Sequence, residues 1–282
     1  AGLHDITIGH YEGGGVAGLL VHYTPPGGVD QLLPNSVLFP DANETVFENP
    51  VNVTQNSTIS GVAIASRMTN LTVNSGVTLT VSGNEVAATT TNLSAGTTTF
   101  NVSESFATGT IVDGGADIDI VKSGPGVLVF DNTATPQLQN VGSSITVNEG
   151  SAGILLGGAL NPIGNASITF AGGGISLSSK AGDQSFAIPA FAGNEASIIA
   201  RQLPSGVAGI PGAPVNINLT GNLSVSAAQT LTLGTADNYE INVGGTGSGG
   251  GTVAINGGVV NGKTNSVLQG VNVRLRSDGG AS

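Results

Sequence analysis

The sequence lacks several residue types on which protein chemistry commonly depends. Cysteine and tryptophan are absent, and the three histidines, His4, His10 and His22, all lie within the first 22 positions. Without cysteine there can be no disulfide, no thiolate metal ligand and no cysteine nucleophile. A Ser–His–Asp triad would have to be built around one N-terminal corner. We therefore predict that the chain is not an enzyme.

Basic residues are also scarce. Seven Lys and Arg stand against 18 Asp and Glu, which gives a formal net charge of −11. Scattered basic residues cannot form the phosphate-neutralising patch that nucleic acids require, so we expect no nucleic-acid partner. We expect Lys122, Lys180 and Lys263 to be solvated. Apolar runs stay shorter than about 18 residues and no basic leader opens the chain, so we predict neither membrane insertion nor an export signal.

Alternation of apolar and polar residues is what the sequence has in abundance. Short runs rich in β-branched residues recur between Val51 and Leu275, bounded by Gly, Asn, Ser or Asp. This period-two pattern predicts β-strands. The polar members are mostly Thr, Asn and Ser, which can stack on neighbouring strands without like-charge repulsion. The segment 194–203 instead predicts a helix, with Asn194 as its cap and Pro204 after its end.

The apolar positions favour a solenoid over other all-β architectures. They hold Val, Ile, Leu and Ala, while aromatic residues make up only 4% of the chain. A sandwich or barrel usually anchors its interior with large aromatics, whereas small aliphatics suit the narrow interior of stacked coils. We predict an all-β chain with a parallel, right-handed β-solenoid over residues 41–282. An antiparallel strand segment over residues 1–40 is expected to precede it.

Two stretches resemble the autotransporter-associated β-strand repeat of bacterial secreted proteins. Residues 121–130 (VKSGPGVLVF) are similar to the L-x-K-x-G-x-G-x-L-x-L opening of that repeat, and residues 145–155 (ITVNEGSAGIL) to its second half. Residues 159–170 resemble the segment that usually follows, whereas residues 131–136 replace the hairpin of the repeat with a different sequence. The resemblance implies a passenger-like solenoid that is secreted or displayed on a bacterial surface.

A second resemblance lies at the N-terminus. Residues 1–8 and 11–19 look like the closing strands of a PA14 domain, and residues 32–38 resemble its exit. Strands separated from their sheet carry unpaired backbone groups, so they would fold back on the first coil or be donated to a neighbouring copy. The acidic pair that binds carbohydrate and calcium in some PA14 domains lies upstream of the matching portion. The resemblance therefore transfers no binding residues.

The densest acidic cluster is a weak candidate for a calcium site. Asp117 and Asp119 share one strand face, and Asp113 could fold near them across a turn. Three carboxylates with turn carbonyls could approach the six or more oxygen ligands of Ca²⁺. A solvated turn is the alternative, and it is the one we favour. Apart from this candidate we expect no metal and no cofactor.

The histidines and the asparagines have alternative readings as well. His4 and His10 would share a strand face, either as a paired metal site or on the partly buried face of a hairpin whose turn is Gly13–Gly18. N-x-S/T triplets could accept glycans on an exported surface, or could simply be alternating strand sequence. These triplets begin at Asn43, Asn52, Asn56, Asn70, Asn92, Asn101, Asn165, Asn218 and Asn222.

Together these patterns predict a mechanical role. We expect an extracellular or cell-surface structural protein, a stiff stalk or fibre subunit, whose partners are copies of itself joined head to tail, by strand addition at its open ends. The alternative is an adhesin or glycan-binding module, although Tyr11, Tyr23 and Tyr239 are the only tyrosines available to contact sugars. A polysaccharide lyase or hydrolase would need clustered acids and a basic residue in a groove, which the dispersed acids disfavour.

Overall fold

The computed structural model separates the chain into two compact units, Ala1–Asn43 and Glu44–Ser282. The residues that the structure describes are 22–24, 27–29, 31–32, 44–61, 65–131, 138, 140–157, 163–187, 190–204, 214–220, 223–225, 228–243, 247–248, 252–256, 259–262 and 272–276. Among these residues every regular element is a β-strand. No helix in the described part of the chain is long and apolar enough to cross a membrane.

The first unit contains an antiparallel strand pair. β1 (His22–Tyr23) and β2 (Gln31–Leu32) place His22 opposite Leu32 and Tyr23 opposite Gln31. The antiparallel pairing predicted for the N-terminal segment is therefore present. The face shared by His4 and His10, and the turn predicted at residues 13–18, lie outside the described residues.

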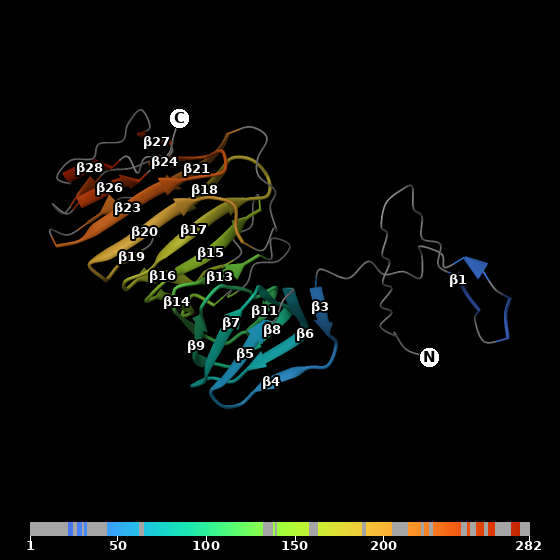
Figure 1. Cartoon of the computed structure of the whole chain (residues 1–282). Coiled ribbons are helices and arrows are strands. Elements are labelled where there is room, and N and C mark those ends of the chain that lie inside the picture. The colour runs from blue at the N-terminus through green and yellow to red at the C-terminus, as the bar shows by residue number, and fades with distance from the viewer. Residues whose placement is uncertain are drawn as a thin grey trace, which may run out of the picture. The chain divides into compact units, whose positions relative to one another are not determined.

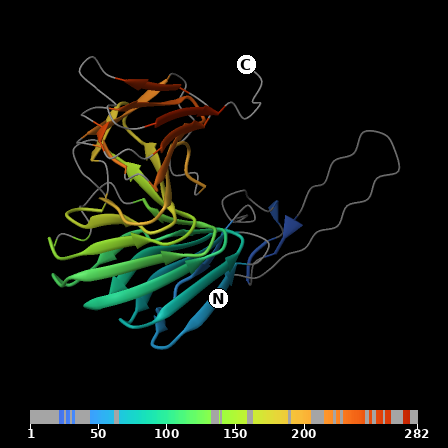
Figure 2. The same ribbon diagram turned by 90° about the vertical axis from the view of Figure 1, so that its left-hand side faces the viewer.

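The second unit is a β-solenoid of stacked parallel strands, which confirms the predicted fold class (Figures 1 and 2). One sheet of 13 strands, here called the long sheet, runs along the whole unit. Its strands are β3 (Glu44–Phe47), β4 (Val51–Val53), β6 (Ala65–Val73), β8 (Val86–Leu93), β10 (Ser105–Ala107), β11 (Thr110–Val112), β13 (Val127–Phe130), β15 (Ser151–Leu156), β17 (Gly174–Ser179), β20 (Glu195–Ala200), β23 (Thr230–Thr235), β26 (Thr252–Asn256) and β28 (Asn272–Arg276).

Smaller parallel sheets complete the coils. A seven-stranded sheet belongs to the N-terminal part of the unit. Its strands are β5 (Ser57–Gly61), β7 (Thr78–Gly83), β9 (Gly96–Val102), β12 (Ile118–Ser123), β14 (Ser144–Val147), β16 (Ser167–Phe170) and β19 (Ala190–Phe191). A four-stranded sheet follows, with strands β18 (Gln184–Ala187), β21 (Val215–Thr220), β24 (Tyr239–Val243) and β27 (Val259–Gly262). β22 (Leu223–Ser224) pairs with β25 (Gly247–Ser248).

The core consists of residues aligned from coil to coil. One file in the long sheet, here called the core file, is Thr45, Ser66, Val86, Phe106, Leu128, Ala152, Ile175, Ile198, Leu233, Ile255 and Leu275. Its members from Val86 to Ile198 are fully buried. Neighbouring strands lie about 4.8 Å apart, so these buried side chains pack on one another from coil to coil. A buried side chain of this size contributes about 1.5–3 kcal/mol.

The helix predicted over Asn194–Leu203 is wrong. Residues 195–200 form β20, which pairs parallel with β17 and β23. Ala196, Ile198 and Ala200 are buried, whereas Ile199 is only partly buried. The capping residue and the following proline were compatible with either element. Residues 195–200 form a strand because every second side chain is buried and because the neighbouring strands on both sides offer hydrogen-bonding edges.

Candidate functional site

Lys122 is the most unusual side chain in the described core. It belongs to a file of the seven-stranded sheet in which Leu79, Phe100, Lys122, Val147 and Phe170 follow one another in register. All five are completely buried. The prediction that Lys122 is solvated is therefore wrong. Strand β12 places it there because Lys122 shares its parity with the core residues Ile118 and Ile120.

The Lys122 ammonium group is held by backbone carbonyls. Nζ donates hydrogen bonds to the carbonyl oxygens of Ser123 at 2.8 Å, Gly124 at 2.6 Å and Glu149 at 3.1 Å. Ser123 is the last residue of β12, Gly124 follows it in the turn, and Glu149 lies in the turn after β14, one coil later. These contacts satisfy the three donors of the ammonium group. Lys122 therefore fastens two successive coils to each other from the inside.

The electrostatics of Lys122 combine burial with a nearby negative charge. Desolvation lowers the pKa of Lys122 to about 8, against a smaller opposing effect of the Glu149 carboxylate. A lysine with a lowered pKa can act as a nucleophile or a base when a substrate can reach it. Here the side chain has no exposed surface. The geometry supports a structural role.

Asp131 is a half-buried ionisable group. It follows β13, and its Oδ1 accepts a hydrogen bond from the Gly109 backbone N–H at 3.0 Å. Burial raises the pKa of Asp131, while that hydrogen bond and the positive charges of Arg67 and Lys180 oppose the rise. Gly109 has a φ of 58°, and a Cβ there would collide with the backbone of Thr89. The carboxylate thus stabilises a tight turn.

The acidic residues proposed for calcium are engaged separately. Asp113 is half-buried, with Oδ1 accepting from the Gly115 N–H at 2.9 Å and Oδ2 enclosed without a hydrogen-bond partner. Asp119 accepts from Ser144 Oγ at 2.6 Å, and Asp117 is exposed. Within the described ranges no three His, Cys, Asp or Glu side chains are grouped so that they could hold a metal ion. Calcium binding remains a prediction without a gathered ligand set.

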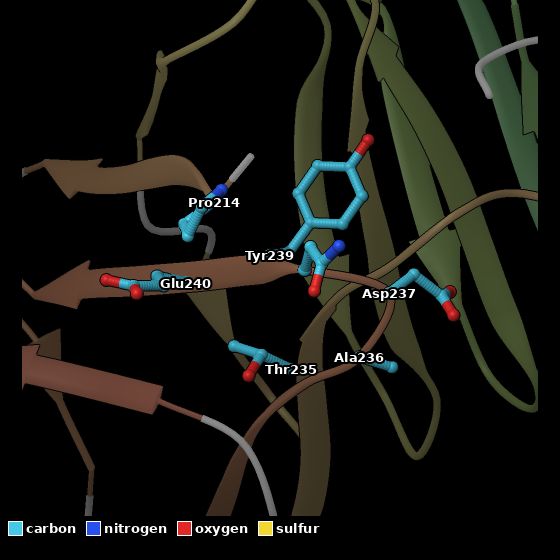
Figure 3. A pocket seen from close by; sticks show the side chains of 7 residues that line it. Pro214, Thr235, Ala236, Asp237, Tyr239 and Glu240 are labelled. Atoms are coloured by element: carbon cyan, nitrogen blue, oxygen red, sulfur yellow. The ribbon is translucent and has the colours of Figure 1, made fainter. Parts of the chain in front are cut away.

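A shallow depression of about 330 Å³ lies at the turn between β23 and β24 (Figure 3). Its lining residues are Pro214, Thr235, Ala236, Asp237, Asn238, Tyr239 and Glu240. The Asp237 and Glu240 carboxylates point to opposite sides in Figure 3, and Asp237 Oδ2 accepts a hydrogen bond from the Gln202 N–H at 3.0 Å. Glycoside hydrolysis needs two converging carboxyl groups. This depression does not bring such a pair together.

Tyr239 connects the two sheets of the C-terminal coils. Its side chain is 3% exposed, and its hydroxyl lies 3.0 Å from Ser178 Oγ in β17. The same hydroxyl accepts from the Ser179 backbone N–H at 3.0 Å. A buried tyrosine usually needs such partners for its hydroxyl. The Tyr239 hydroxyl therefore has its hydrogen-bond partners inside the molecule.

Uncharged polar ladders line the outside of the coils, as the sequence predicted. The Oγ atoms of Ser60 and Ser82 lie 2.9 Å apart, one coil from each other. Asn242 Nδ2 donates to Asn216 Oδ1 at 2.9 Å and to Asn218 Oδ1 at 3.2 Å. Such side chains can stack in register because no like charges meet.

Several candidate glycan acceptors and basic residues can now be placed. Of the N-x-S/T asparagines, Asn52, Asn56 and Asn165 are exposed. The prediction of solvation fits Lys180, which is exposed after β17. Asn43, Asn222 and Lys263 lie outside the described residues. Glycosylation stays a prediction.

The outermost strands of the second unit are the remaining candidate site. Within the described residues, β3 and β4 each pair only with β6, and β28 pairs only with β26. In the smaller sheets, β5 and β27 likewise end their ladders. Val46 and Phe47 in β3 are 50% and 51% exposed. Phe47 is the register partner of the buried Met68, so among the described residues it is the first member of its own file.

These sites can be compared with known proteins. No protein-family model, curated protein or solved structure matches the chain.

Proposed function

We propose that the chain is a structural protein, a stiff β-solenoid stalk or fibre subunit that joins head to tail with copies of itself. The observation that carries the proposal is that β3 and β28, at the two limits of the long sheet, are each paired on one side only within the described residues. A parallel edge presents unpaired N–H and C=O groups, which readily accept another strand. The half-exposed Phe47 adds apolar surface at the same end.

The location proposed for this stalk is extracellular, on a bacterial surface. Support comes from the resemblance of residues 121–130 and 145–155 to the autotransporter-associated repeat, and of the N-terminal residues to PA14 strands. Ladders of uncharged side chains connect successive coils, and the chain has no cysteine for disulfides. Such an architecture suits a protein with a mechanical role. The proposed partner is another copy of the chain, and no cofactor is part of the proposal.

Electron microscopy combined with light scattering tests the fibre proposal. We expect fibres or a concentration-dependent ladder of oligomers when the purified chain is concentrated. The spacing of about 4.8 Å between strands should continue across each junction between two copies. Fibre diffraction detects this spacing. A monodisperse 27.6 kDa species at every concentration, without fibres, would overturn the proposal.

A glycan-binding module is the second candidate, favoured by the outer face of the seven-stranded sheet. Thr78, Thr99, Thr146 and Thr169 lie in one register file there, interrupted by Val121. This file offers aligned hydroxyl groups to an extended sugar chain. A glycan array with the purified chain tests it. Binding that disappears in Thr99→Val and Thr146→Val would favour this candidate, and an empty array would remove it.

A further inference from the structure

The two edges of the long sheet are compatible in direction. β3 and β28 belong to a sheet in which every pairing is parallel, so all its strands run the same way. A second copy can therefore continue the ladder at β28 with its own β3, without turning round. Such a contact joins two different surfaces, and repeating it produces an open filament.

The two edges are also complementary in charge. β28 contains two basic residues, Arg274 and Arg276, and no acidic one. β3 contains one acidic residue, Glu44, and no Lys or Arg, and Glu48 follows it. In a chain of net charge −11, the two edge strands of the long sheet thus carry charges of opposite sign. Opposite charges on adjoining strands stabilise their pairing.

The core file fixes the register of the junction. The file begins at Thr45 in β3 and ends at Leu275 in β28. We propose, on the basis of the proposed function, that β28 of one copy pairs parallel with β3 of the next so that Leu275 adjoins Thr45. In this register Arg274 lies opposite Glu44, and Arg276 lies opposite Val46 and diagonal to Glu48. A slip by one residue would move the apolar set to the opposite face.

Charge reversal tests the pairing of Arg274 with Glu44. Glu44→Arg or Arg274→Glu replaces an attraction by a repulsion, and each should raise the concentration at which fibres form by about tenfold. The double variant should restore assembly, which also shows that the single variants were folded. Glu195→Arg is the matched control, because Glu195 is an exposed residue of β20 in the middle of the long sheet. Its fibres should form as in the parent chain.

Cysteine cross-linking tests the register directly, because the chain has no cysteine of its own. A mixture of Val46→Cys and Arg276→Cys chains should give an intermolecular disulfide on oxidation. The paired Cα atoms would be about 4.8 Å apart, within disulfide range. Val46→Cys mixed with Arg274→Cys should not cross-link, because the offset of two residues takes the Cα atoms beyond about 7 Å.

The outcomes separate this junction from the wider proposal. Fibres that ignore both charge reversals and give no Val46–Arg276 cross-link would overturn the junction and leave the fibre function standing. A cross-link of Val46 to Arg274 in place of Arg276 would overturn the register. No assembly of the parent chain under any condition would overturn both proposals. Rescue by the double variant with the expected cross-link would support both.

Discussion

At the scale of single residues, Lys122 shows how a narrow aliphatic core accommodates a charged group. The side chain occupies a position between Phe100 and Val147 in its file, where an aliphatic residue would be expected. Its ammonium group reaches three carbonyls, at the end of β12 and in the two turns beyond β12 and β14, so the charge is hydrogen-bonded although it is buried. Buried charges are tolerated in proteins when their donors are satisfied in this way.

Replacing Lys122 by methionine should destabilise the solenoid. The variant keeps the hydrophobic volume but leaves three carbonyls without their donor, and we expect the free energy of unfolding to fall by about 1–3 kcal/mol. Lys180→Met is the control, because Lys180 is exposed. That change should stay within about 0.5 kcal/mol. Urea unfolding followed by circular dichroism measures both; equal midpoints for the two variants would contradict the role of Lys122.

The pKa of Lys122 predicts a pH dependence with a definite sign. Burial lowers the pKa of Lys122 from 10.5 to about 8, so between these values the unfolded chain binds more protons than the folded chain. The contribution of Lys122 to stability should therefore rise with pH from about 8 to about 10.5 and be constant below that window. The measurement is the difference in unfolding free energy between the parent and Lys122→Met, from pH 7 to pH 10.5. A difference that falls across the window would contradict the lowered pKa.

At the scale of elements, the turns differ in how closely they approach the neighbouring coil. Gly124 has a φ of 77°, and a Cβ built there would lie 2.6 Å from the carbonyl oxygen of Val102 in the preceding coil. Gly76 has nearly the same φ, 75°, but no heavy atom within 4 Å of such a Cβ. A substitution at Gly76 therefore tests backbone strain alone, whereas a substitution at Gly124 tests the same strain together with the close approach of the preceding coil.

Alanine at these two glycines should have unequal effects. Gly76→Ala adds only the cost of a left-handed backbone, about 1–2 kcal/mol. Gly124→Ala adds a collision with the neighbouring coil, and we expect a further loss of about 1–3 kcal/mol. Thermal and urea unfolding of the two variants provide the comparison. Equal losses would show that the coils are not stacked as closely as described.

The strand formed by residues 195–200 predicts unequal effects of alanine at two adjacent isoleucines. Ile198 is fully buried in the core file, whereas its neighbour Ile199 faces outwards and is only partly buried. Ile198→Ala should cost about 2–5 kcal/mol through the cavity that it leaves. Ile199→Ala should cost about 1 kcal/mol or less. Similar large losses at both positions in urea unfolding would argue against the alternation of a strand.

At the scale of the whole molecule, stability in the second unit is distributed along a stack. Each coil contacts mainly its neighbours, so the stability of a solenoid is close to a sum of coil and interface contributions. Inner strands such as β13, β15 and β17 are paired on both sides. β3 and β4 are paired on one side within the described residues.

Hydrogen exchange should therefore be graded along the stack. Amides of β13, β15 and β17 should exchange most slowly, and amides of β3 and β4 most rapidly, because local opening needs fewer broken contacts at an edge. Mass spectrometry of peptic peptides measures the gradient. If the chain forms fibres, protection of β3 should increase with chain concentration. Uniform exchange from β3 to β17 would contradict coil-by-coil stability.

The sequence by itself determined the fold class. Alternation in segments such as residues 77–81 and 271–275, with few aromatics, specified parallel strands around a thin aliphatic core, because successive side chains of a strand point to opposite faces. It also indicated the uncharged ladders, since Thr, Asn and Ser alternate with the apolar positions. The parity of Lys122 with Ile118 and Ile120 is the sequence signal for its burial, whereas its charge predicts exposure to solvent.

Only the tertiary structure decided what depends on the neighbouring coil. Residues 195–200 carry helix-compatible ends, and the hydrogen-bonding edges of β17 and β23 make them a strand. The carbonyls that hold the Lys122 ammonium include that of Glu149, 27 residues away, which no local pattern specifies. The separate partners of Asp113 and Asp119 likewise depend on the register of β12 against β14. Local alternation fixes which face of a strand is buried, whereas stacking fixes which residues meet.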